Sequence, residues 1–151
     1  MRRSLVLLAA CASCVATPAL ADSWRVVGQA GAAPGRMVHL VDTDSIVRQG
    51  DAVTFSSMTI WEERAPDSEF DKSITERKGD CVAKSSAIVS MSTYAEGRFL
   101  DTEYGTGEVI AHGPNSTARA LLDSACGVRG YATEPLPDPE ASVRGNFART
   151  R

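Results

Sequence analysis

The sequence predicts an α+β protein in which a small antiparallel β-sheet packs against a C-terminal helix and is closed by one disulfide bond. Three observations lead to this prediction. Short runs of β-branched and aromatic residues alternate with glycine-containing turns over most of the chain. One later segment, Ser116–Cys126, has the periodicity of an amphipathic helix. Beyond an apolar N-terminal segment, the chain keeps two cysteines, Cys81 and Cys126.

Residues 1–21 have the composition of a secretory signal peptide. Two arginines precede an apolar run, Leu5–Ala16, that is too short to span a bilayer, and Ala-Leu-Ala at 19–21 fits a cleavage site. We therefore expect an exported protein that begins at Asp22 and has no transmembrane segment. Cleavage before Cys11 would instead give a lipoprotein. That cut would leave only six apolar residues before it, which argues against a lipid anchor at Cys11.

The mature chain is acidic, and this limits its partners. Removal of residues 1–21 takes two of the 16 basic residues and none of the 19 acidic ones, which leaves a formal net charge of −5. Because no dense basic run compensates, nucleic acid and anionic lipid are poor candidates. The remaining length of about 130 residues suits one domain. We place that domain at residues 22–130.

The first strands follow directly from the start of the mature chain. Trp24–Val27 is expected as the first strand, and Arg36–Asp42 as a central strand because apolar residues occupy both of its faces. A tight turn at 50–51 leads into the longest strand, Ala52–Glu63. Its apolar parity changes at 56–57, which predicts either a bulge or a strand that is covered on both faces.

The charged segment Glu63–Asp80 is predicted to be a long connection or a splayed hairpin tip, because it carries both signs of charge, one proline and little periodicity. A solvated connection is one interpretation and a binding loop is the other. Aromatic and arginine side chains often anchor interfaces. The candidate binding residues in this segment are Arg64, Phe70, Lys72, Arg77 and Lys78.

A second hairpin is expected after this segment. The runs Cys81–Tyr94 and Gly97–Tyr104 are joined by a short turn with glycine, which is typical of an antiparallel pair. Val109 and Ile110 are expected to form a short edge strand. Aromatic residues such as Tyr94 and Tyr104 could contribute to a recognition surface, although strand aromatics more often fill the core.

The predicted helix has a clear beginning, face and end. Asn115 or Ser116 can cap its free amide groups, and Gly127 is suited to close it. Its apolar residues form one stripe that includes Cys126. The following segment, residues 131–151, contains three prolines and little apolar content, so we expect a disordered C-terminal tail.

The two mature cysteines are best explained by a disulfide bond. A zinc site would need both of them together with His39 and His112, and these four residues have no paired ligand spacing. The mature chain has no C-x-x-C motif, and no motif places a base beside either thiol. Export, an even number and a buried helix position favour a Cys81–Cys126 bond.

Catalytic and cofactor motifs are not apparent. The glycines at 28–35 lack the spacing of a dinucleotide loop, and no serine lies in a nucleophile elbow. No acid, base and nucleophile converge in the pattern, so we expect neither an enzyme nor a cofactor or metal site. The enzyme hypothesis would require His39 or His112 to meet a carboxylate in a pocket.

The order of these landmarks resembles the surface-adhesin protein E family of Gram-negative exported proteins. The landmarks are Trp24, "VDTDSIVRQGDAVTF", the charged stretch that ends in "GDC", "STYAEGRFL", and the serine-led helix that ends in "ACG". They cover roughly residues 24–127. The resemblance implies a small antiparallel sheet with a helix, and a disulfide at the positions of Cys81 and Cys126. It also implies an adhesin that recognises host extracellular-matrix or plasma proteins and can form a homodimer.

We therefore expect an exported, non-enzymatic, adhesin-like binding module that recognises a protein partner at the cell envelope or surface. The alternative is a periplasmic inhibitor or accessory protein of an envelope enzyme. We expect the protein to be located in the periplasm or at the outer cell surface.

Overall fold

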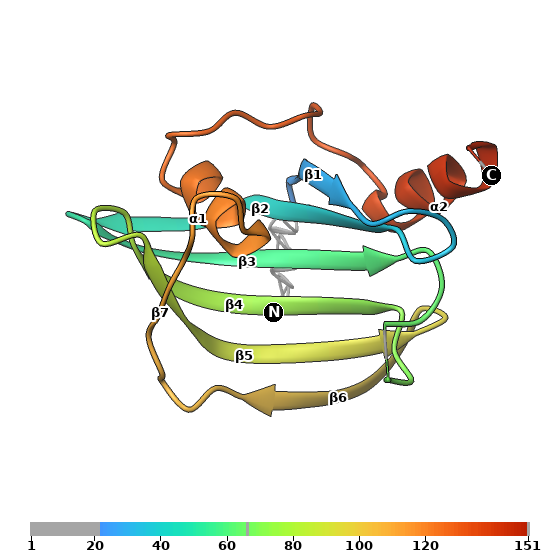
Figure 1. Ribbon diagram of the computed structural model, residues 1–151, viewed down its shortest axis with the longest axis horizontal. Coiled ribbons are helices and arrows are strands. Elements are labelled where there is room, and N and C mark those ends of the chain that lie inside the picture. Colours follow the sequence, from blue (N-terminus) through green and yellow to red (C-terminus); the bar gives the residue numbers. More distant parts are fainter. Residues whose placement is uncertain (1–21, 66, 151) are drawn as a thin grey trace, which may run out of the picture.

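The computed structural model describes residues 22–65 and 67–150, so the predicted signal peptide lies outside the described residues. Six strands form an antiparallel meander in chain order, and a seventh pairs with the beginning of β5 (Figure 1). The elements are β1 (Trp24–Ala30), β2 (Met37–Gln49), β3 (Ala52–Trp61), β4 (Lys72–Asp80), β5 (Ser85–Ala95), β6 (Arg98–Tyr104), β7 (Ile110–Ala111), α1 (Thr117–Ala125) and α2 (Pro139–Arg149). The α+β class and the antiparallel sheet are confirmed.

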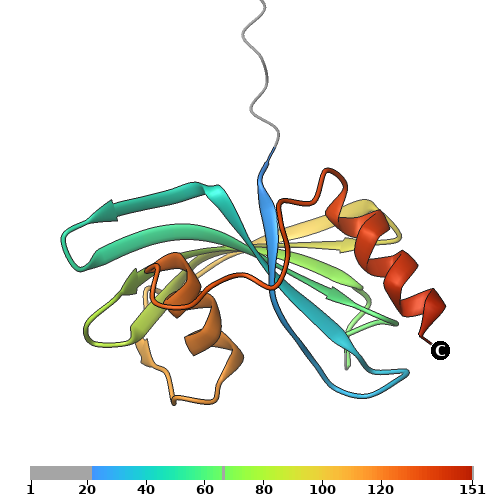
Figure 2. The same cartoon turned by 90° about the horizontal axis from the view of Figure 1, so that it is seen from above.

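The central strands are buried on both faces, with one helix on each side (Figure 2). On one face, Leu40 and Ile60 pack with Phe147 of α2. On the other face, Val41 and Phe55 pack with α1. Since alternate residues of a strand point to opposite faces, the two sets occupy opposite parities. The parity change within β3 therefore reflects cover on both faces, and the bulge lies in β2, between Asp42 and Val47.

Helix α1 confirms the predicted helix to within a residue at each end. The Ser116 hydroxyl accepts a hydrogen bond from the Arg119 amide at 3.2 Å, which caps the N-terminus. Leu121 and Leu122 are buried against the sheet. Gly127 follows the helix at φ +75°, a backbone conformation that glycine adopts without strain.

The Cys81–Cys126 disulfide is confirmed, with Cα atoms 5.8 Å apart. Cys81 lies in the turn between β4 and β5 rather than at the head of a strand. Cys126 is the C-terminal cap of α1. The bond therefore joins the end of α1 to the β4–β5 turn, across 45 residues of sequence.

The predicted disordered tail at 131–151 is wrong for the described part of that segment. Asp138 caps α2 through its side chain, Pro139 occupies the first turn, and Val143 and Phe147 are buried. Proline is favourable at this position because its missing N–H has no intrahelical acceptor there. Before the helix, the amides of Ala132 and Leu136 donate to carbonyls of β1 at 2.7 and 2.9 Å. The segment thus covers the β1 edge of the sheet.

The prediction of a long connection or a splayed hairpin tip at Glu63–Asp80 is also wrong for the second half of that segment. Lys72–Asp80 is β4, a central strand that pairs with β3 along its whole length and with β5 on the other side. β4 carries charged side chains because the sheet is only partly covered by helices. The segment therefore lacks the apolar pattern of a central strand. The connection itself is limited to the residues between β3 and β4.

Candidate protein-binding surface

The five candidate binding residues do not form one surface. Arg64 is exposed in the β3–β4 connection, and Phe70 lies half-buried at the end of that connection. Lys72, Arg77 and Lys78 belong to β4. Strand alternation directs Lys72 and Lys78 to the face that carries α2, and Arg77 to the face that carries α1.

Two of these residues have clear structural partners. The Lys72 ammonium forms an ion pair with Glu140 of α2 and lies 4.5 Å from the centre of the Tyr94 ring. Phe70 packs edge-to-face on Trp61, with ring centroids 5.4 Å apart. Lys72 therefore holds α2 on the sheet, and Phe70 closes the β3–β4 connection.

Arg77 forms part of a half-buried polar layer on the α1 face. Its Nε donates to the Ser57 hydroxyl at 3.2 Å, and burial lowers the pKa of its guanidinium. Burial also lowers the pKa of His112, and the positive charge of Arg77 lowers it further. The His112 Nε2 lies 2.7 Å from the Ser86 hydroxyl, and the His39 Nδ1 lies 3.1 Å from the Thr59 hydroxyl. Each imidazole therefore has a hydroxyl partner.

An exposed apolar surface lies at the opposite edge of the sheet from the N-terminal strand. Five large apolar residues gather around the β5–β6–β7 junction, and we call them the edge patch. They are Ile88, Val89, Tyr104, Val109 and Ile110, with exposed fractions from 37% to 83%. Clustered apolar exposure of this kind is typical of an interaction site, whereas single exposed apolar residues are ordinary.

The edge patch arises from an unusual strand arrangement. β6 pairs with the second half of β5 and β7 with its first two residues, so the chain from Gly105 to Val109 passes over the middle of β5. The Gly105 amide donates to the Val89 carbonyl at 2.9 Å. A Cβ on Gly105 would lie 1.8 Å from the Ile88 carbonyl oxygen, so only glycine permits this approach.

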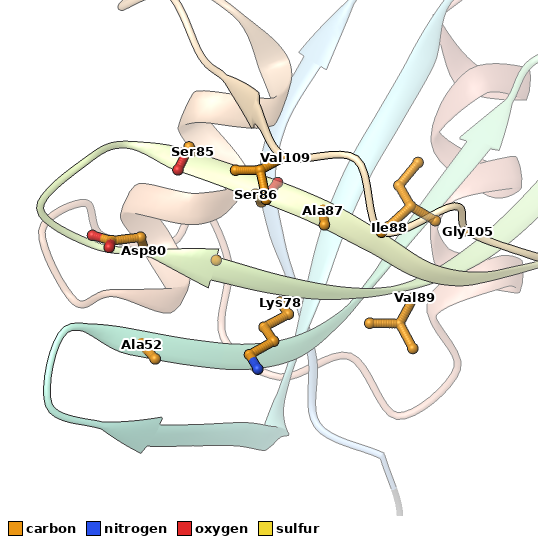
Figure 3. A pocket seen from close by; sticks show the side chains of 12 residues that line it. Ala52, Lys78, Asp80, Ser85, Ser86, Ala87, Ile88, Val89, Gly105 and Val109 are labelled. Atoms are coloured by element: carbon orange, nitrogen blue, oxygen red, sulfur yellow. The ribbon is translucent and has the colours of Figure 1, made fainter.

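A cavity of about 610 Å³ opens beside this crossing segment, and Ala87, Val89 and Val109 form part of its wall. Figure 3 labels Ala52 of β3, Lys78 of β4 and Val89 of β5 among the side chains that line it. A second cavity of about 260 Å³ lies by the same segment and includes Tyr104 and Ile110. Lys78 lines the first cavity and Arg77 lines the second, so the two hollows lie on opposite faces of the sheet, one on each side of the edge patch.

The larger cavity has a polar rim and no helix above it. Lys78 and Asp80 line it from β4, on the face that carries α2. α2 contacts this face through Lys72, and Lys78 lies six steps further along β4, or about 20 Å away. An apolar centre with charged residues at its margin is the usual anatomy of a protein-binding site.

A scan against protein-family models finds a match over residues 24–127, to a family described as surface-adhesin protein E. The chain belongs to the surface-adhesin protein E family. The predicted resemblance is therefore confirmed, and it covers all the strands together with α1. A search of curated proteins returns no match. Helix α2 and the segment that leads to it lie beyond the matched range.

Membership in the surface-adhesin protein E family agrees with an exported or surface-located, adhesin-like protein. No helix among the described residues is long and apolar enough to cross a membrane. The same residues hold no group of three or more metal-ligating side chains.

Sequence reasoning identified the edge patch only in part. It singled out Tyr104 as a possible recognition residue and expected an edge strand at Val109 and Ile110, but it did not connect them with Ile88 and Val89. The available signal was the glycine pair at 105 and 107 between two apolar runs, which marks a close approach of the backbone to a neighbouring strand.

Proposed function

We propose that this protein is a non-enzymatic, adhesin-like module that binds a protein partner at the cell envelope or cell surface through its edge patch. The observation that carries the proposal is the cluster of exposed apolar residues around the 105–109 segment, beside an open sheet edge. The family description supports binding to a protein as the general role. Host extracellular-matrix or plasma proteins are the partners we propose first.

The two edges of the sheet differ in a way that supports this site. The β1 edge is covered by the chain around Ala132–Leu136, which donates hydrogen bonds to it. Among the described strands, β6 has a neighbour only on its β5 side, so its other side presents unpaired backbone groups. An open edge strand next to an apolar cavity suits a partner that offers an extended segment and apolar side chains.

The proposal replaces the charged segment by the edge patch as the binding surface. Lys72 and Phe70 are engaged within the molecule, and Arg77 points to the opposite face from Lys78. Of the five predicted residues, Lys78 lines the larger cavity and Arg77 lines the smaller one, on the other face of the sheet. Each adds a positive charge to the margin of the proposed surface.

A matched pair of valines tests the proposal. Val109 is 67% exposed at the edge patch, and Val128 is 68% exposed after α1. The variants Val109→Glu and Val128→Glu therefore add the same charge at equal exposure. Each variant and the wild type would be immobilised and presented with periplasmic extract in one arm and with matrix and plasma proteins in the other.

We expect the wild type and Val128→Glu to retain the same partner, and Val109→Glu to lose it by about tenfold or more, because a charge is desolvated at the centre of the contact. A partner from the matrix arm supports the adhesin-like role, and an envelope enzyme from the periplasmic arm supports the inhibitor alternative. Equal retention by both variants would remove the edge patch as the binding surface.

A further inference from the structure

A separate cavity lies at the start of α1, and residues of β1 and β2 also line it. Its volume is about 330 Å³. Gly28 and Gln29 of β1, His39 of β2, Asn115–Thr117 and Arg129 line it. It lies at the β1 side of the sheet, remote from the edge patch at β5 and β6.

The floor of this cavity holds a buried imidazole with an unused nitrogen. His39 is only 7% exposed, and its Nδ1 bonds to the Thr59 hydroxyl of β3 at 3.1 Å. Its Nε2 is buried and has no hydrogen-bond partner among the described residues. His39 lines the cavity, and Nε2 is the ring nitrogen that the Thr59 hydroxyl leaves available to a ligand there.

The space beside this imidazole is open because residue 28 has no side chain. Gly28 is directly paired with His39, so both face the same side of the sheet. A Cβ added at Gly28 would meet nothing within 4 Å. Its backbone is not in the left-handed region, so no strain of the chain requires glycine there. Gly28 therefore leaves room for a ligand next to the buried His39 imidazole.

The remaining walls are electropositive. The first turn of α1 contains no acidic residue, and its leading amides at Thr117 and Ala118 have no intrahelical acceptors. Arg129 is exposed at the rim and has no ion pair among the described residues. None of the described residues that line this cavity is acidic.

We propose that this cavity binds a small oxyanion, either a carboxylate or a phosphate group, between Arg129, the first-turn amides of α1 and the His39 imidazole. The Thr59 hydroxyl donates to Nδ1 in this arrangement, so Nε2 carries the proton and donates to the anion. A helix N-terminus with a nearby guanidinium is well suited to this charge. The site is independent of the edge patch, and its test does not depend on the proposed protein partner.

The test is an NMR titration of the folded chain with inorganic phosphate in one arm and acetate in the other, with chloride used to hold the ionic strength constant. The observed signals are the Thr117 and Ala118 amides and the His39 ring. Gly28→Leu places a side chain in the cavity, and a Cβ at this position meets no other atom within 4 Å. Arg129→Gln removes the guanidinium, and Arg98→Gln removes an exposed arginine of β6 as the matched control.

We expect one of the two anions to shift all three signals in a saturable manner, with a dissociation constant of about 1 mM or below. Gly28→Leu should abolish the shift, Arg129→Gln should weaken binding by about fivefold or more, and Arg98→Gln should leave it unchanged. The anion whose shifts saturate identifies whether the cavity prefers a phosphate or a carboxylate group. Absence of a saturable shift with both anions, or equal binding by Gly28→Leu, would overturn the proposal.

Discussion

At the scale of single residues, His39 is the most informative side chain. It lies between apolar neighbours on a central strand, and such an imidazole is usually satisfied within the core. Burial lowers its pKa to about 4, and the positive charge of Arg77 contributes in the same direction. The neutral form is therefore the one that the fold accommodates.

This pKa predicts how stability depends on pH. The unfolded chain binds a proton at His39 below about pH 6.5 and the folded chain only below about pH 4, so the free energy of unfolding should decrease as pH falls through this window. The loss attributable to His39 is on the order of 3 kcal/mol at most. Urea unfolding of the wild type and His39→Gln between pH 7 and pH 4 measures it.

The variant supplies the control for that measurement. His39→Gln removes the titrating group, so its stability should fall less steeply than that of the wild type over the same pH range. Equal slopes for the two proteins would mean that the imidazole keeps an ordinary pKa in the folded state.

At the scale of elements, two arginines of the β2 region secure the C-terminal ends of the two helices. Arg48 donates to the Ala125 carbonyl at the end of α1, at 2.5 and 3.0 Å. Arg36 donates to the Phe147 carbonyl near the end of α2, at 3.0 Å. A positive charge at a helix C-terminus opposes the partial negative charge of the free carbonyls. β2 and the residue that precedes it thus contact both helices, one on each face.

Arg36 has more partners than Arg48, and its removal should release α2 from the sheet. Its guanidinium makes a bidentate pair with Glu62, at 2.7 Å for both bonds, and lies 5.1 Å from the Phe147 ring centre. Arg36→Ala should lower the free energy of unfolding by about 3 kcal/mol, because the substitution breaks a buried, bidentate ion pair with Glu62. Chemical denaturation measures this loss. Limited proteolysis should cut first in residues 131–138, the segment that leads into α2.

Two further variants make this result specific. Arg36→Lys keeps the charge but not the planar fork, so it should lie between the wild type and Arg36→Ala. Arg149→Ala removes an exposed arginine in the last turn of the same helix and should cost less than about 1 kcal/mol. An Arg36→Ala protein as stable as the Arg149→Ala protein would contradict this account of α2.

The elements also show which parts of the fold the sequence could predict. Helix α1 was predictable because its apolar stripe, serine cap and closing glycine agree with one another. Helix α2 was missed because two apolar residues, Val143 and Phe147, make a narrow stripe. Its attachment depends on Arg36 and Lys72, which are distant in sequence. The signal that was present was Asp138 before Pro139, a cap followed by a proline at the first helical position.

The candidate site was less predictable than the fold, for a physical reason. Charged residues in β4 gave the pattern of a loop, although alternate side chains of this strand face opposite sides of the sheet. The edge patch is assembled from residues of β5, β6, β7 and the segment between the last two. Only the pairing of both β6 and β7 with β5 brings these residues together, and that pairing has no local sequence pattern.

At the scale of the whole molecule, the disulfide and the two helices leave one part of the sheet uncovered. α1 is tied to the β4–β5 turn by Cys81–Cys126, a closure of 45 residues worth about 4 kcal/mol in the chain-entropy model. α2 and the segment before it cover the β1 side. The β5–β6 side remains open, with its apolar residues exposed. Within the described part of the chain, an open strand edge with exposed apolar residues is suited to binding a protein partner.

The measurement that tests this most directly is photo-crosslinking on living cells that are incubated with matrix and plasma proteins, with a photoreactive phenylalanine analogue in place of Tyr104 in one strain and of Val128 in the other. Both positions are strongly exposed, at 83% and 68%, but only Tyr104 belongs to the edge patch. We predict a discrete crosslinked protein from position 104 and none from position 128. The same adduct from both positions, or an adduct from position 128 alone, would contradict the assignment of the edge patch as the binding surface.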